Sequence, residues 1–217
     1  MTTIIRKSQG KLLSVGFLLV GVIMLMQVVL PTISFQLWAW GQAMNNQILV
    51  SPIRPNEQVL GVSVENKDNF PAFVSSSAPT ERIYDKFSLS VPKLKIQNVD
   101  VFVDNNDLSI GLSHLPGSAL PGEKGNVFIS GHSALRPAFS IKQAFFSNLT
   151  DLKKGDQIII NTPGSKFVYE VIGFKVVNPS DLSVIAAPEP TGRYVSLMTC
   201  VPPGLNFKRL VVLGKMI

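Results

Sequence analysis

The chain has 217 residues, a formal net charge of +6 and a single cysteine. Three positive charges, Arg6, Lys7 and Lys11, stand together near the N-terminus, and the other Lys and Arg residues form no clustered stripe of the kind that binds nucleic acid. We therefore expect no nucleic acid partner. A lone cysteine excludes an internal disulfide framework. No dense acidic cluster points to a metal ion, and we expect no metal and no cofactor.

The first predicted element is an apolar helix. Leu12 to Leu30 carries no charge, and at about 1.5 Å per residue it makes a helix of about 28 Å, close to the hydrocarbon thickness of a bilayer. Pro31 is expected to interrupt it, and Trp38 and Trp40 are of the kind that sit at membrane interfaces. The pattern predicts a membrane anchor in contact with lipid.

The anchor is predicted to be retained, with residues 1–11 in the cytoplasm and the membrane segment over residues 12–40. The basic residues precede the apolar stretch, so the chain after it should lie outside the cell. A cleaved signal peptide is the alternative, but its apolar stretch would be only about 7–15 residues long.

The next segment, residues 41–80, is rich in Asn, Ser, Pro and Gln and has no sustained period. It ends in "VSSSAPT", Val74 to Thr80. Such a composition is typical of a linker, so we expect an extracytoplasmic stalk.

Residues 81–217 have the texture of one mainly β domain. Short β-branched and aromatic runs alternate with turn signals, which predicts an antiparallel barrel or sandwich. "IIINTPGSKFVYEV" predicts a hairpin with Pro163-Gly164 at its tip. Phe139 to Leu152 is expected to form helix or 3₁₀ turns, with one face formed by Phe145, Phe146 and Leu149.

Three polar residues stand at the ends of separate strand-like runs. His132 follows "NVFISG", Cys200 ends "YVSLMTC" and Arg209 begins "RLVVLG". Gathered at one rim, a thiol, an imidazole and a guanidinium make a cysteine transacylase site. Each also has a plain structural reading: a buried thiol, a packing histidine and a surface arginine.

These segments resemble one enzyme family. "SLMTCVPPGLNFKRL" is similar to the Thr-Leu-x-Thr-Cys signature of sortases, which is followed by an Arg in the next strand. "HLPGSALPGEKGNVFISGHSA" resembles the segment with the family's catalytic His, and "VPKLKI" resembles its first strand. The resemblance spans roughly Phe87 to Gly214.

The resemblance implies a closed, antiparallel β-barrel of about eight strands with one or two short helices. It also implies a cysteine transpeptidase that cleaves surface proteins at a C-terminal sorting signal of Leu-Pro-x-Thr-Gly type, between Thr and Gly. An amine of the cell wall or of a pilin would then resolve the thioacyl enzyme. Cys200 would be the nucleophile, His132 the acid/base and Arg209 the oxyanion and substrate clamp.

The resemblance also indicates substrate-binding residues. In sortases the connection that corresponds to Asn178–Tyr194 forms a wall of the substrate groove, although an ordinary Pro-stiffened loop is an equal alternative here. Ser133 stands where many members have Arg, which leaves the subfamily open. The candidates for substrate binding are Leu182, Val184, Ile185, Ser196, Thr199 and His114, of which His114 has a loop hydrogen bond as its alternative role.

Other functions remain open from the sequence. An L,D-transpeptidase is also an extracytoplasmic Cys/His transacylase, but it would have a His-Gly-Cys run, whereas Cys200 follows Thr199. A membrane-anchored β-barrel that acts as a binding module without catalysis is the other alternative. For a catalytic Cys200, a nearby Arg209 would raise the thiolate fraction, but the sequence leaves open whether thiol or thiolate dominates at neutral pH.

Overall fold

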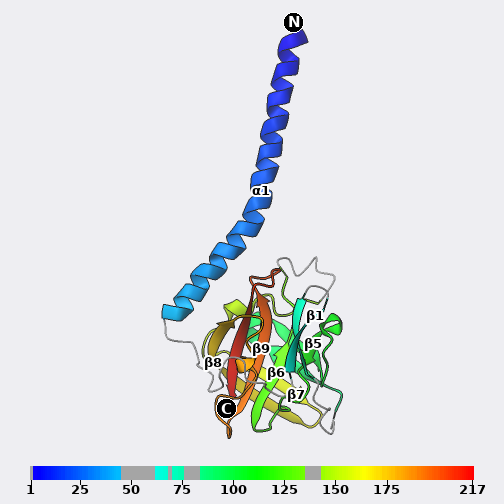
Figure 1. Ribbon diagram of the computed structural model, residues 1–217, viewed down its shortest axis with the longest axis vertical. Coiled ribbons are helices and arrows are strands. Elements are labelled where there is room, and N and C mark those ends of the chain that lie inside the picture. The colour runs from blue at the N-terminus through cyan, green and yellow to red at the C-terminus, as the bar shows by residue number, and fades with distance from the viewer. Residues whose placement is uncertain (1, 45–61, 68–69, 76–83, 135–142) are drawn as a thin grey trace. The chain divides into compact units, whose positions relative to one another are not determined.

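The computed structural model describes residues 2–44, 62–67, 70–75, 84–134 and 143–217 (Figure 1). It divides into two compact units, Met1–Trp38 and Ala39–Ile217, which are described separately.

The N-terminal element α1 is a single helix over Thr2–Met44. Its stretch Leu13–Gln42 is long and apolar enough to cross a membrane. The expectation that Pro31 would interrupt the helix is wrong, because α1 continues through it. A proline inside a helix removes one backbone hydrogen bond and does not have to end it; here the Ser34 hydroxyl donates to Pro31 O at 3.0 Å.

The second unit contains the predicted closed barrel of eight strands, in the order β10-β8-β7-β3-β4-β5-β6-β9 (Figure 1). Its strands are β3 (Lys86–Val91), β4 (Ile96–Phe102), β5 (Leu112–His114), β6 (Gly125–Ser130), β7 (Gln157–Thr162), β8 (Ser165–Val177), β9 (Arg193–Val201) and β10 (Lys208–Met216). Short 3₁₀ turns interrupt the connections: η1 (Pro92–Leu94), η2 (Leu108–Ile110), η4 (Leu149–Asp151) and η5 (Leu182–Val184).

The strand directions differ from the expectation at two junctions. β4 pairs with β5, and β6 with β9, in parallel, whereas the other barrel pairs are antiparallel. A two-residue period reports which side chains share a face and carries no information about strand direction. Parallel neighbours need a crossover connection, and β6 reaches β9 only after β7, β8 and η5.

Two local predictions are confirmed. β7 and β8 form the expected hairpin, in which Thr162 pairs with Ser165 around Pro163-Gly164, and Gly164 supplies a positive φ of 97°. Before β7, η4 forms a 3₁₀ turn with Phe146 and Leu149 fully buried. Residues 135–142, which include part of the helical segment expected from Phe139, lie outside the described residues.

The segment expected to be a stalk contains a small sheet. β1 (Val62–Lys67) and β2 (Phe70–Ser75) pair as an antiparallel hairpin. Val62 is 3% exposed and packs in a hydrophobic cluster with residues of the barrel. Part of the chain before residue 81 therefore belongs to the folded domain.

The barrel interior is identified by contacts around Gly214. A Cβ at Gly214 would meet Val195 of β9, Ile158 of β7 and Tyr169 of β8, at 3.0 to 3.3 Å. These strands converge there, so the face of β9 that carries Val195 points into the barrel. Because side chains alternate along a strand, Leu197 shares this inner face, and the residues between face outward.

Candidate active site

Cys200 and Arg209 lie side by side on neighbouring strands. Cys200 of β9 is paired with Arg209 of β10 in the antiparallel ladder, and alternation places both on the outer face of the barrel. Arg209 is fully buried, and its Nη1 donates to Asn206 O at 3.3 Å and Lys208 O at 3.2 Å. The guanidinium is thus held by the backbone of the turn that joins the two strands.

The protonation of this pair follows from burial. Burial raises the pKa of the Cys200 thiol from its ordinary value of 9.0 to about 12, although the positive charge of Arg209 acts to lower it. Burial also lowers the pKa of Arg209, against the opposing effect of Cys200. The thiol is therefore protonated at neutral pH, and desolvation outweighs the arginine whose effect we expected to favour the thiolate.

His132 follows β6, in a segment fastened to the strand that carries Cys200. Gly131 N donates to Met198 O at 3.0 Å, and the Thr199 hydroxyl donates to Gly131 O at 2.9 Å. One residue beyond His132, the Ser133 hydroxyl donates to Cys200 O at 2.7 Å. These three bonds fix the backbone on both sides of His132 against the last residues of β9.

Gly131 permits this close approach. A Cβ at position 131 would lie 2.6 Å from side-chain atoms of both Leu112 and Phe146, which is closer than real Cβ contacts. Phe146 N in turn donates to His132 O at 3.1 Å. The absence of a side chain at Gly131 therefore lets the backbone between β6 and His132 pack directly against Leu112 and Phe146.

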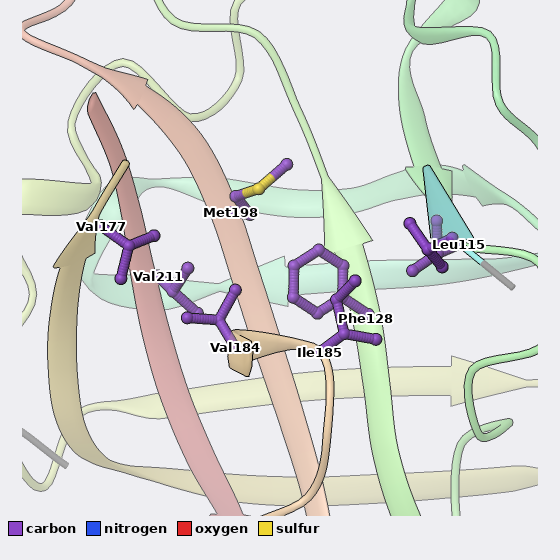
Figure 2. Close-up of a cluster of buried hydrophobic side chains, with 8 residues drawn as sticks. Leu115, Phe128, Val177, Val184, Ile185, Met198 and Val211 are labelled. Atoms are coloured by element: carbon purple, nitrogen blue, oxygen red, sulfur yellow. The ribbon is translucent and has the colours of Figure 1, made fainter. Parts of the chain in front are cut away.

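An apolar cluster lies on the same outer face, next to Cys200. Met198 is two residues before Cys200, and Val211 is two residues after Arg209, so each shares its partner's face. Figure 2 shows Val184, the last residue of η5, and Ile185, which follows it, beside Val211 and Phe128; residues 182–185 are called the η5 segment below. Among the residues whose side chains are described, the apolar cluster consists of Val62, Leu115, Phe128, Val177, Val184, Ile185, Met198 and Val211, with Leu182 and Ala186 packed against it.

The structure brings together only some of the predicted substrate-binding residues. Val184 and Ile185 belong to the apolar cluster and Leu182 packs against it. Ser196 lies on the outer face of β9 and is fully buried. Thr199 lies on the inner face by alternation, and its hydroxyl is the one that bonds to Gly131.

His114 occupies a separate, buried network. Asp104 N donates to Nδ1 of His114 at 3.3 Å, so Nδ1 is an acceptor and the proton is on Nε2. Nε2 then donates to Ala119 O at 3.0 Å, and the Ser118 hydroxyl lies 2.9 Å from the same nitrogen. Ser118 donates to Leu115 O at 2.8 Å, so the network shapes the chain that carries Leu115.

Sequence reasoning missed several residues around the site. Ser133 was noted as a departure from the family, but its bond to Cys200 was not foreseen. Met198 and Val211 could have been found from the two-residue period of their strands, counted from Cys200 and Arg209. Within the described ranges, no group of three or more His, Cys, Asp or Glu side chains is placed to hold a metal ion.

Comparison with known proteins agrees with this geometry. The family model of the sortase domain matches residues 89–217. The chain is similar to sortase D of Bacillus subtilis (strain 168), with 30% identity over 131 residues, and to sortase A of Bacillus anthracis, with 28% over 144 residues. These matches cover 58% and 66% of this chain, and 61% and 64% of the relatives, which is less than two thirds of either.

Comparison with solved structures also finds similarity to sortases. The lid mutant of sortase A from Corynebacterium diphtheriae superposes with a TM-score of 0.53 at 35% identity, covering 62% of this chain and 70% of that one. The family model covers more than half of the chain and includes both Cys200 and Arg209. The chain therefore belongs to the sortase family.

Proposed function

We propose that the protein is a membrane-anchored cysteine transpeptidase that cleaves surface proteins at a Leu-Pro-x-Thr-Gly-type signal and transfers them to an amine. The observation that carries this proposal is the pairing of Cys200 with Arg209 beside a His132 segment that is hydrogen-bonded to the same strand. A nucleophile, an acid/base and a fixed cation at one place suit acyl transfer.

The first half-reaction forms the thioacyl enzyme. The Cys200 thiol gives its proton to His132 and its sulfur attacks the carbonyl carbon of the signal's Thr. The Thr–Gly peptide bond then breaks, and His132 gives that proton to the leaving Gly amine. Arg209 stabilises the negative charge that develops on the carbonyl oxygen. The new carboxyl end of the surface protein is then held as a thioester on Cys200.

The second half-reaction releases the product. An amine of the cell wall or of a pilin attacks the thioester carbon, a new amide bond forms, and the Cys200 sulfur leaves. His132 takes the proton that the amine loses and passes it to the departing sulfur, which restores the protonated Cys200 thiol. Both halves therefore use the same three side chains, with His132 alternating between acid and base.

The raised pKa of Cys200 determines the protonation state of the nucleophile in the resting enzyme. With a pKa of about 12, the thiol keeps its proton at neutral pH in the free enzyme. The nucleophile becomes charged only when its proton moves, with His132 as the acceptor. This keeps a lone exported thiol unreactive towards oxidants until a substrate is present.

The apolar cluster supports recognition of the Leu-Pro part of the signal. It lies on the same face as Cys200 and begins at Met198, two residues away. Two residues of an extended chain span about 7 Å, so side chains upstream of the cleaved bond would reach Met198 and the η5 residues.

The remaining parts of the proposal concern location. Helix α1 anchors the protein in the cell membrane, with the N-terminus in the cytoplasm and the barrel outside, because Arg6, Lys7 and Lys11 precede the apolar stretch. Protease added to spheroplasts should remove the barrel and leave the N-terminal segment protected. A mature chain that begins near Ala43 would overturn retention of the anchor.

Activity is tested by trapping the acyl enzyme. Purified full-length protein is incubated with a library of Leu-Pro-type peptides, and the mass added to Cys200 is measured, with and without hydroxylamine as an acceptor amine. We expect an adduct with the peptide's N-terminal part and its release as a hydroxamate. Cys200→Ala should give neither, while Lys208→Ala, which changes the exposed neighbour of Arg209, should match the wild type. Full cleavage by Cys200→Ala, or no adduct with any peptide, would overturn the proposal.

A further inference from the structure

The η5 segment is held by two hydrogen bonds that take no part in the chemical steps. Asn126 of β6 donates from Nδ2 to Ile185 O at 2.8 Å, and Val184 O lies 3.5 Å from the same nitrogen. From the opposite side, Nζ of Lys175 in β8 donates to the Ser183 hydroxyl at 3.0 Å. The strand order here is β6-β9-β10-β8, so η5 crosses the outer face of β9 and β10 between its two tethers.

Asn126 is an unusual residue for its position. It is 4% exposed and is followed in β6 by the buried Val127, Phe128 and Ile129. Its Nδ2 end faces the two η5 carbonyls, and its buried Oδ1 has no hydrogen-bond partner among the described residues. Burying an amide with one end unpaired is unfavourable, and the hydrogen bond from Nδ2 to Ile185 O offsets part of that cost.

Asn126 is too far from Cys200 to touch the reacting atoms. It pairs with Tyr194 in the ladder, six positions before Cys200, which is about 20 Å along a strand. The four residues before the cleaved bond of a sorting signal span only about 13 Å when extended. Any influence of Asn126 on the reaction must therefore act through η5.

We propose that Asn126 is a positioning residue for substrate selection, which fixes η5 and the following Ile185 against the outer face of the barrel that also carries Cys200. This inference rests on the proposed function. The tether determines how closely Val184 and Ile185 pack against Met198 and Phe128, and that packing sets which apolar side chain of the signal fits beside η5. Lys175 secures the other end of η5 and has a weaker effect, because it is partly exposed and bonds to a side chain.

The test compares two peptides, one with Leu and one with Ala at the first signal position, in wild type and Asn126→Ala. We expect KM for the Leu peptide to rise about tenfold with kcat within about twofold, and the preference for Leu over Ala to fall by a similar factor, within the range for one apolar pocket contact. Hydrogen exchange at the Ile185 amide, which donates to Leu182 O, should become faster in the variant. Asn161→Ala, an amide on β7 away from η5, is the matched control and should leave both properties unchanged.

The outcomes separate this inference from the proposed function. If the wild type cleaves the Leu peptide but Asn126→Ala keeps KM and selectivity within about twofold, the inference is overturned and the proposed function stands. If the wild type forms no thioacyl adduct, the proposed function fails and the selective role falls with it. Should Asn126→Ala not fold, the nearly isosteric Asn126→Asp decides, because it places a carboxylate oxygen against Ile185 O and should show the same loss of selectivity.

Discussion

The two histidines of this chain lie in contrasting surroundings. His114 has the composition of a serine hydrolase triad, with Oδ1 of Asp104 3.4 Å from Nδ1 and the Ser118 hydroxyl 2.9 Å from Nε2. Yet it is fully buried, and its Nε2 donates to Ala119 O. His132 is half-buried, and its neighbours Gly131 and Ser133 are hydrogen-bonded to the strand that carries Cys200. The comparison teaches that hydrogen-bond direction and burial, more than the set of residue types, separate a structural histidine from a candidate catalytic one.

The sharpest test of the contrast is to remove each ring. His132→Ala should lower kcat/KM by about 10²–10⁴-fold, because general acid–base catalysis is lost, with little change in melting temperature. His114→Ala should keep most activity and lose about 1–3 kcal/mol of stability, because Asp104 N and Ala119 O lose their buried partner. Peptide cleavage kinetics and thermal unfolding of both variants check this, and exchanged phenotypes would reverse the assignment.

A second test uses the protonation of Cys200. Its pKa of about 12, against an ordinary 9.0, leaves about a thousandfold less thiolate at neutral pH than an exposed cysteine would have. Alkylation by iodoacetamide should therefore be slow and should rise about tenfold per pH unit up to pH 11. Arg209→Met should slow it further at each pH, since the guanidinium lowers this pKa, and a plateau near pH 8 would contradict the buried neutral thiol.

A third test concerns the guanidinium of Arg209, which lies beside Cys200 in the candidate active site. Arg209→Ala and Arg209→Lys should each lower kcat/KM by about 10²–10³-fold, because the first removes an oxyanion donor and the second loses the planar fork. Lys208→Ala is the control on the adjacent, exposed position. Peptide cleavage assays measure all three, and normal turnover by Arg209→Ala would place Arg209 outside the site.

The smallest expected effect concerns Ser133, which ties the His132 segment to Cys200 O. Ser133→Ala should lower kcat about tenfold with KM nearly unchanged, because a misplaced acid/base slows the chemical step and leaves substrate binding intact. Ser133→Thr keeps the hydroxyl and should restore most of the rate. Equal loss in both variants would mean that the bond is not what positions His132.

The sequence was sufficient to predict the β class, the hairpin at Pro163-Gly164 and the position of His132, Cys200 and Arg209 at or just beyond strand ends. Each of these depends on local signals: alternation, turn residues and short motifs. The parallel pairing of β6 with β9 could not be read, because it joins segments separated by two other strands. The tether from Asn126 to Ile185 was equally hidden, because it links positions 59 apart.

Two predictions failed for a different reason: that Pro31 would interrupt the helix, and that residues 41–80 would contain no regular structure. Proline lowers helix propensity without forbidding helix, and a polar, Pro-containing segment can still pair when a domain offers it a surface. Val62 shows the second case, since it is buried in the apolar cluster. Composition alone indicated a linker because the burial of one residue such as Val62 carries no periodic signal.

The burial of Val62 has a practical consequence for truncation. A soluble fragment cut at Glu81, where the β-rich texture begins, would lose a side chain whose burial is worth about 1.5–3 kcal/mol and would bare apolar surface beside Leu115 and Phe128. Peptide preferences measured on such a fragment would then report a surface that the whole chain keeps partly covered. A fragment that starts before Val62 retains this contact, and comparing the two lengths measures how much the N-terminal hairpin contributes to the proposed substrate-binding surface.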